Sequence, residues 1–361
     1  MSRLPEKLKS IRWTLITPFL LLGLLGAAYG VWWVSLADRI ETAVLEWQAE
    51  QSARGLDATW EKFETNGFPY RLEIKLNAPS INMRDTPQPW GWSAGDLRAE
   101  MLPYNLNHII VDVQSDQTIH YSRKTAGALE LFLLNISSDN TWASLVNEGE
   151  GDQRLAVDLT NLFAQRELRS SDGPIASGIA SAARLQLHAR PSPGQTDVSF
   201  DAAFRGEDIS WANFGETPWP GNAIAKLDVQ ARLSGLPQRL PSSLATVLPG
   251  AFANGTKLAI SEFTLNWGPI DMTGRGEVTL DAKGRPEGRF TTSVGNLQGL
   301  ITGLVQAGIV SQQSANLAFA GMVALSSFQG EPEGRVRLPV AMKEGVLFLG
   351  PIAAARLEPL F

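Results

Sequence analysis

Histidine and cysteine are the residues that most often bind metals or act as nucleophiles and bases, and this chain has few of them. It contains no cysteine and three histidines, His108, His120 and His188. The absence of cysteine excludes a disulfide scaffold, a thiolate metal site, a cysteine nucleophile and a redox dithiol. A metal site would need His108 and His120 to face each other across a hairpin. Because the three histidines lie in separate strand-like segments, we predict no metal site and no cofactor.

The motifs of common enzyme classes are also missing. The chain has no Gly-x-Ser-x-Gly elbow and no Gly-x-x-x-x-Gly-Lys-Ser/Thr phosphate loop. The run RSSDGPIASG is typical of an exposed loop, and Gly274 and Gly276 in TGRGEV lie between strand patterns rather than before a helix. A catalytic carboxylate pair is the remaining alternative, among the acidic residues of the strand patterns: Asp158, Asp197, Asp228 and Glu277. These residues fit a solvated strand face better, and we predict that the protein is not an enzyme.

The charge is distributed unevenly along the 361 residues. The chain as a whole carries a formal charge of -6, yet residues 1–12 hold four basic residues against one acidic residue. Residues 13–37 hold no charge, so the remainder combines 27 Lys/Arg with 36 Asp/Glu. A domain with this excess of negative charge binds polyanions poorly, which excludes nucleic acid as a partner.

The uncharged segment 13–37 predicts a transmembrane helix that serves as a signal anchor. A helix of 25 residues is about 37 Å long, enough to cross a hydrocarbon core of about 30 Å. Trp13 at one end and Trp32 with Trp33 at the other match an aromatic belt. The basic stub, residues 1–12, predicts a cytoplasmic N-terminus and an exported remainder. Cleavage of a signal peptide near Gly26-Ala27-Ala28 is the alternative.

The exported part predicts a mainly β fold: a large antiparallel, curved sheet or sandwich with a few packed helices. We expect a membrane-proximal helical segment over 38–66 and a β-rich domain over 67–361. In FPYRLEIKL, apolar residues alternate with polar ones over nine positions, and similar short runs recur down the chain. DAKGRPEG (281–288) is typical of a tight hairpin connection. A soft boundary near 234–241 leaves open a division into two sheet units.

Helices are predicted at 240–250 and from the spacing of Leu297, Leu300, Ile301, Leu304 and Val305. The stretch 290–330 carries no charge, but SQQSAN interrupts it, so a buried helix followed by a strand at ANLAFAGMVAL fits better than a second membrane span.

The strand alternation defines a candidate apolar face, which includes Leu72, Ile74, Leu76, Leu227, Val229 and Leu233. In an ordinary sandwich, a second sheet or the helices would cover this face. The other interpretation is that the face is partly open and binds lipid acyl chains near the membrane.

Several segments, in this order, resemble a family of inner-membrane-anchored bacterial envelope proteins known as domain of unknown function 2125. They are the apolar anchor, the helix with Trp47, NGFPYRLEI and WSAGDLRAEMLPYNLNHIIVDV. The residues that carry the resemblance, with no assigned role, are Gly67, Phe68, Pro69, Tyr70, Arg71, Pro103, Tyr104, Asn105 and His108. The sequence pattern of strands and turns in the C-terminal part also resembles AsmA-like periplasmic proteins, which are associated with phospholipid movement. The resemblance implies an anchored, β-rich periplasmic domain and no catalytic residues.

Together these features predict a single-pass inner-membrane protein with a periplasmic bulk. We expect a non-enzymatic role in envelope maintenance or lipid binding, with membrane lipid and envelope proteins as partners. A ligand-free structural or interaction subunit of an envelope complex is the main alternative, and an envelope hydrolase is a further one.

Overall fold

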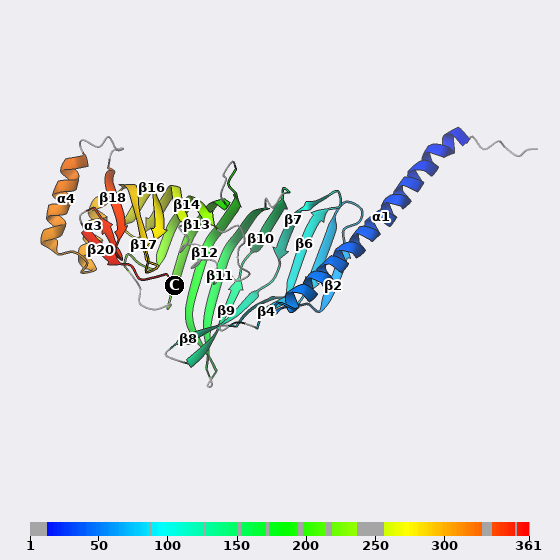
Figure 1. The fold of residues 1–361 in the computed structure, drawn as a ribbon, viewed down its shortest axis with the longest axis horizontal. Helices are drawn as coiled ribbons and strands as arrows, with labels where there is room; N and C mark the ends of the chain where they lie inside the picture. Colours follow the sequence, from blue (N-terminus) through cyan, green and yellow to red (C-terminus); the bar gives the residue numbers. More distant parts are fainter. Residues whose placement is uncertain are drawn as a thin grey trace, which may run out of the picture.

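A long helix leaves one end of an elongated β-sheet and two shorter helices lie at the other end, in the computed structural model of Figure 1. The helices are α1 (Trp13–Ser52), α3 (Leu297–Gln306) and α4 (Gln312–Ser326). The structure describes residues 13–84, 86, 89–125, 128–149, 153–170, 173–193, 198–213, 219–236, 256–326, 334–350 and 352–360. The helix expected at 240–250 lies outside these residues.

The described strands form one antiparallel sheet, which confirms the predicted fold class. The first ten are β1 (Leu56–Thr59), β2 (Lys62–Asn66), β3 (Leu72–Asn77), β4 (Ser80–Met83), β5 (Trp90–Ala94), β6 (Asp96–Leu102), β7 (Asn105–Val113), β8 (Gln117–Thr125), β9 (Ala128–Ser137) and β10 (Asn140–Asn147). The others are β11 (Gln153–Ser170), β12 (Gly173–Pro191), β13 (Val198–Ala212), β14 (Ala223–Leu236), β15 (Lys257–Trp267), β16 (Ile270–Leu280), β17 (Pro286–Val294), β18 (Val336–Lys343), β19 (Val346–Leu349) and β20 (Ile352–Arg356).

The sheet forks at β11. Its first half pairs with β10 and its second half with β9, so two branches diverge from one long strand. One branch runs β10–β7–β6–β3–β2 and the other runs β9–β8–β5–β4–β1. On the other side of β11, each strand from β12 to β20 pairs with the strand that precedes it in the sequence.

Two expected boundaries differ from the structure. The helical segment expected over 38–66 ends at Ser52, because β1 and β2 already begin the sheet within that range. The sheet also continues across the boundary expected near 234–241, since β14 pairs along its length with β15. The sheet is therefore not divided into two units at that point.

A line of irregular residues crosses the middle of the sheet. Asn161 on β11 has φ 50° and Asp208 on β13 has φ 49°, and both residue types tolerate this left-handed conformation. On β13 the alternation changes phase near Asp208, because a side chain added at Gly206 would lie 2.5 Å from Cδ1 of Ile209, three residues along the strand. Gly206 and Ile209 therefore lie on the same face, although an odd number of residues separates them.

The end of α1 nearest the sheet forms a small core with β3 and β6. Trp33 and Ala37 are buried against Leu72, Ile74 and Met101. The side chains of α1 from Ile16 to Tyr29 are exposed. The helix therefore has two parts: a bare apolar stretch, and a segment that belongs to the sheet domain.

A second core lies beneath α3 and α4. Leu297, Leu300 and Leu304 of α3 pack against Val294 of β17 and Leu338 of β18. The helix predicted from this leucine spacing is confirmed, and the Asn296 side chain caps it by accepting a hydrogen bond from the backbone N–H of Gly299.

The strand expected at ANLAFAGMVAL is wrong, because these residues form most of α4. Ala315, Phe319 and Met322 pack into the second core at intervals of three and four residues. The alanine-rich sequence favours a helix, and this spacing gives the helix a face to bury.

The predicted hairpin at 281–288 is confirmed as the turn between β16 and β17. The Asp281 carboxylate accepts hydrogen bonds from Nε of Arg285 at 2.8 Å, and from the backbone N–H groups of Arg285 and Lys283. These bonds, the Arg285 side chain first, lower the pKa of Asp281 to about 2.

Truncation of Leu300, which is 1% exposed, tests the second core. We expect Leu300→Ala to lower the free energy of unfolding by about 2–5 kcal/mol, because it leaves a cavity under α3. The matched control is Leu317→Ala on α4, where the side chain is 72% exposed and the expected change is below about 0.5 kcal/mol. Urea denaturation of the full chain in detergent measures both, and equal effects would contradict this core.

The left-handed position at Asn161 gives a second test. Asn161→Val forces a β-branched residue to φ 50°, whereas Asn161→Gly removes the same side chain without that strain. We expect the valine variant to be less stable than the glycine variant by about 1–2 kcal/mol. The measurement is thermal unfolding of the two variants under the same conditions. Identical stabilities would contradict a left-handed backbone conformation at Asn161.

Candidate functional site

A continuous row of small and apolar residues crosses the sheet from the α1 end to the α3–α4 end. Each residue of the row is the direct cross-strand partner of the next, so all of them point to the same face. The row, called here the apolar track, consists of Leu72, Met101, Ile109, Leu145, Leu155, Ala189, Ala202, Ala231, Ile260, Gly276, Phe290, Val340 and Leu349. With strands about 4.8 Å apart, the track is about 58 Å long, roughly twice the thickness of a hydrocarbon core.

Exposure along the track is low at the ends and higher in the middle. Leu72 is 0% exposed under α1 and Val340 is 8% exposed near α3, whereas Leu145 and Leu155 are 37% and 39% exposed. Within the described part of the chain, the track residues from Leu145 to Gly276 belong to neither buried core. Helices therefore cover the two ends of this apolar face. Among the described residues, neither buried core extends over its middle.

In the middle of the track the side chains are small, so they leave a narrow strip of low relief between the larger side chains on each side. Ala189, Ala202, Ala231 and Gly276 lie between two rows of larger apolar side chains on the same face. One row contains Leu187, Phe204, Val229 and Phe263, and the other contains Phe200, Leu233, Leu258 and Val278. Same-face residues of one strand are about 6.8 Å apart, so the flanking rows, one on each side of the track, are about 14 Å apart. This pattern suits a long, thin apolar ligand.

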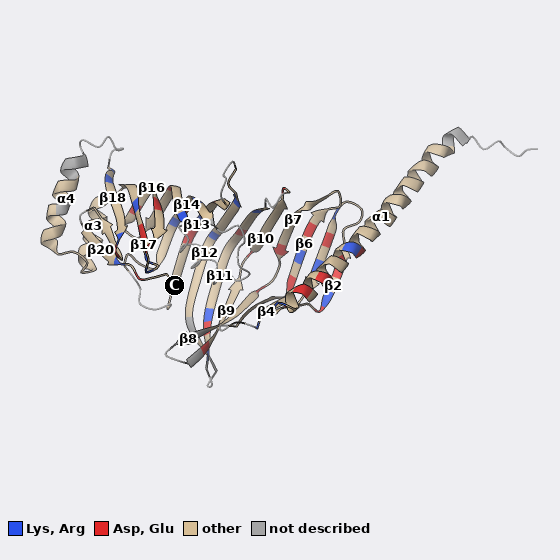
Figure 2. Ribbon diagram, in the orientation of Figure 1, with Lys and Arg blue, Asp and Glu red and all other residues tan. Residues whose placement is uncertain are grey.

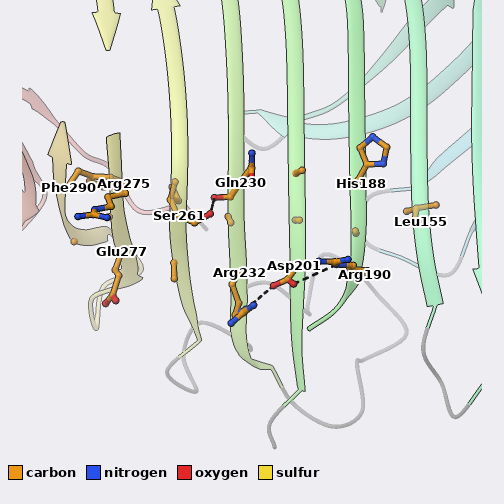
Figure 3. Close-up of a pocket in the computed structure, with 18 of the residues that line it drawn as sticks. Leu155, His188, Arg190, Asp201, Gln230, Arg232, Ser261, Arg275, Glu277 and Phe290 are labelled. Atoms are coloured by element: carbon orange, nitrogen blue, oxygen red, sulfur yellow. Dashed lines mark hydrogen bonds and ion pairs between the residues drawn. The ribbon is translucent and has the colours of Figure 1, made fainter. Parts of the chain in front are cut away.

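A hollow of about 1800 Å³ lies on the opposite face of the same part of the sheet. On β10, Ser144 and Val146 line the hollow while Leu145 of the track does not, and none of the apolar residues that flank the track belongs to the lining. Most of the lining side chains belong to the strand neighbours of the track residues (Figure 3). The neighbours supply all the charges: Arg154, Arg190, Arg232, Arg275, Arg289, Asp201, Glu277 and Glu287. Five arginines against three carboxylates make the lining basic in a chain whose formal charge is -6.

Asp201 joins two of these arginines in Figure 3. Its carboxylate accepts a hydrogen bond from Nε of Arg232 at 2.8 Å and lies 3.7 Å from Nε of Arg190. The bond from Arg232, with a further one from Ser192, lowers the pKa of Asp201 below its usual range. Arg275 and Arg289, by contrast, form no ion pair or hydrogen bond with their side chains among the described residues. These two guanidinium groups are therefore available to an anionic group.

The groups that could act in catalysis are not brought together. His108 lies on β7, where its Nε2 is 3.0 Å from Oγ of Ser144, while His120 lies on β8 in the other branch of the fork. Asp158 and Asp228 each pair with an arginine, at 2.6 Å with Arg184 and 2.9 Å with Arg205. No group of three metal-ligating side chains exists among the residues that the structure describes. Asp197 lies outside them.

The residues that carry the family resemblance gather mostly at the α1 end of the sheet. Gly67 to Arg71 form the turn before β3, and Pro103 with Tyr104 form the turn between β6 and β7. These turns are neighbours because Leu72 pairs with Met101. Asn105 begins β7, and His108 lies further along it, where both residues line the hollow.

The expected anchor tryptophans differ in their surroundings. Trp13 begins α1, and Trp32 is 45% exposed. Trp33, however, is 7% exposed and its Nε1 donates a hydrogen bond to the backbone oxygen of Arg71 at 3.2 Å. Trp33 therefore joins α1 to the sheet, a role that the aromatic-belt interpretation did not include.

The six residues of the candidate apolar face all lie on the face that carries the track. Leu72, Ile74 and Leu76 pack with α1 in the first core. Leu227, Val229 and Leu233 are half-buried in the middle of the sheet. The alanines and Gly276 of the track were missed, because small residues carry no hydrophobic signal until the strand register places them in one row.

Comparison with known proteins places the whole sheet domain in one family. A family model described as "Uncharacterized protein conserved in bacteria (DUF2125)" matches residues 33–358, from the buried Trp33 to beyond β20. No curated protein and no solved structure matches the chain. The chain therefore belongs to the family of uncharacterised bacterial proteins defined by domain of unknown function 2125.

Proposed function

We propose that this protein is a non-enzymatic lipid-binding protein of the bacterial envelope, anchored in the inner membrane by α1, with its sheet domain in the periplasm. In this proposal, acyl chains lie along the middle of the apolar track, over which neither core of the described residues extends. The observation that carries it is the row of small residues, flanked by large apolar ones, between two helix-covered ends.

The helix α1 supports a membrane anchor. One described helix, with a hydrophobic stretch from Ile16, is long and apolar enough to cross a membrane, and a signal sequence would meet the same criterion. Figure 2 shows its distal half free of charge, with charged residues appearing where α1 overlies the sheet. Four basic residues precede the span, which favours a cytoplasmic N-terminus.

The apolar track suits the acyl chain of a lipid. Apolar surface gains roughly 25 cal/mol for each Å² removed from water, so a partly exposed row of leucines and phenylalanines favours an acyl chain. Arg275 and Arg289 line the hollow on the opposite face of the sheet, so they do not contact an acyl chain that lies on the track.

Two neighbouring substitutions on β12 test the apolar track. Leu187 flanks the track and is 38% exposed, whereas the exposed His188 points to the opposite face. We expect Leu187→Gln to weaken the binding of a pyrene-labelled phospholipid by about tenfold, because a buried leucine contributes roughly 1.5–3 kcal/mol. His188→Gln serves as the matched control and should change the affinity little.

The measurement is a fluorescence titration of delipidated full-length protein in mild detergent, with mass spectrometry of the lipids that copurify with untreated protein. Equal affinities of the two variants, or wild-type protein that neither copurifies with lipid nor binds the probe, would contradict acyl-chain binding at the track.

An interaction subunit of an envelope complex is the second candidate function. The charged lining of the hollow favours it, because Arg190, Asp201 and Arg232 form a cross-strand network that a protein partner with acidic groups could contact. Lipid-free protein, together with a membrane partner crosslinked to this lining, would favour this candidate over lipid binding.

A further inference from the structure

Two turns with exposed aromatic residues lie beside α1 at the end of the sheet. The first precedes β3 and carries Phe68 and Tyr70, which are 56% and 82% exposed. The second joins β6 to β7 and carries Tyr104, which is 79% exposed. Both turns lie at the same end of adjacent antiparallel strands, since Leu72 pairs with Met101.

Apolar residues next to the second turn extend the same surface. Leu102 is 40% exposed at the end of β6, and Leu106 is 38% exposed near the start of β7. Large apolar side chains at such exposure are unfavourable in water when they gather at one edge, and they commonly mark a contact surface. We call this set the aromatic rim: Phe68, Tyr70, Leu102, Tyr104 and Leu106.

The first turn is fixed to α1 by direct contacts. The Tyr29 hydroxyl donates a hydrogen bond to the backbone oxygen of Pro69 at 2.5 Å, and the ring of Phe68 lies edge-on to Trp33 with ring centres 5.6 Å apart. The Phe68 ring is also 6.1 Å from that of Tyr29. The aromatic rim therefore lies at a fixed position along the axis of α1.

The turn itself is built to hold this position. Gly67 has φ +99°, and a side chain at this residue would lie 2.7 Å from the backbone oxygen of Arg71. The backbone N–H of Arg71 donates a hydrogen bond to the oxygen of Gly67 at 3.0 Å. Arg71 is also paired with Glu73 at 2.9 Å and Glu100 at 3.5 Å, which links the first turn to β6.

The height of the rim matches the expected membrane surface. Trp13 and Trp33 are 20 residues apart, or about 30 Å along a helix, which equals the thickness of a hydrocarbon core. Tyr29 lies four residues, about 6 Å, on the membrane side of Trp33. Phe68 contacts both, so it lies within one helical turn of the level at which aromatic residues favour the membrane interface.

From these contacts we propose that the aromatic rim is a second membrane contact, which inserts into the interface of the bilayer that α1 crosses. The inference rests on the proposed function of α1 as an anchor. It extends that function, because two separate contacts fix the orientation of the sheet domain on the membrane. The Leu72 end of the apolar track then lies next to the lipid surface.

Single cysteines provide the test, because the natural chain contains no cysteine. Full-length Tyr70→Cys and Tyr104→Cys proteins are labelled with an environment-sensitive fluorophore and reconstituted into vesicles of phosphatidylcholine and phosphatidylglycerol. Part of the phosphatidylcholine carries a doxyl quencher on its acyl chain. Leu317→Cys on α4 is the matched control, since its side chain is equally open at 72% exposure but lies at the far end of the sheet. Leu22→Cys reports insertion of α1.

We expect lipid-borne quenching and a blue-shifted emission for the labels at positions 70, 104 and 22, and neither effect for the label at 317. If position 22 is quenched while 70 and 104 behave like 317, the anchor stands and the membrane contact of the rim is refuted. If position 22 is not quenched either, the anchor itself is refuted, and the proposal for the rim falls with it.

Discussion

Direct cross-strand pairing places opposite residues on the same face of a sheet, and the remaining features of this protein depend on that constraint. Because the pairing is continuous from β3 to β19, one row of side chains joins the core under α1 to the core under α3 and α4. Near Asp208 a change of phase along β13 places Gly206 and Ile209 on the same face, although they are three residues apart.

The helices at the two ends of the sheet have different roles. At one end, α1 buries Trp33 against Leu72 and continues outwards as a bare apolar helix. At the other end, α3 places Leu300 and Leu304 over β17 and β18 and completes a closed core. Between them the face is apolar but only half-buried, while the lining of the hollow on the opposite face carries an excess of arginine. The position and the apolar surface of the track both suit a ligand that comes from a membrane.

Local patterns in the sequence predicted much of this fold. Strand alternation, the turn at Asp281 and the leucine spacing of α3 each depend on residues close together in the chain. Position 315–325 was assigned to a strand because short apolar runs do not distinguish helix from strand by periodicity alone. The fork at β11 and the pairing of β3 with β6 could not be predicted, since they depend on long-range register. The same limit applies to the site: Leu227 and Val229 were visible in the sequence, whereas Ala202 and Ala231 gain meaning only as partners across the sheet.

The neighbour-to-neighbour order from β11 to β20 has a consequence for how the protein assembles. In the proposed topology the sheet domain leaves the membrane from its anchored end, and each strand from β12 to β20 pairs with the one that precedes it. Most of these strands follow their partner after a short loop, which keeps the entropic cost of closure small, whereas α3 and α4 separate β17 from β18. Every new strand also covers the open edge left by its predecessor, which limits the time for which that edge can bind another chain. The order of the strands thus protects the growing sheet from aggregation until β20, only five residues long, leaves a short final edge.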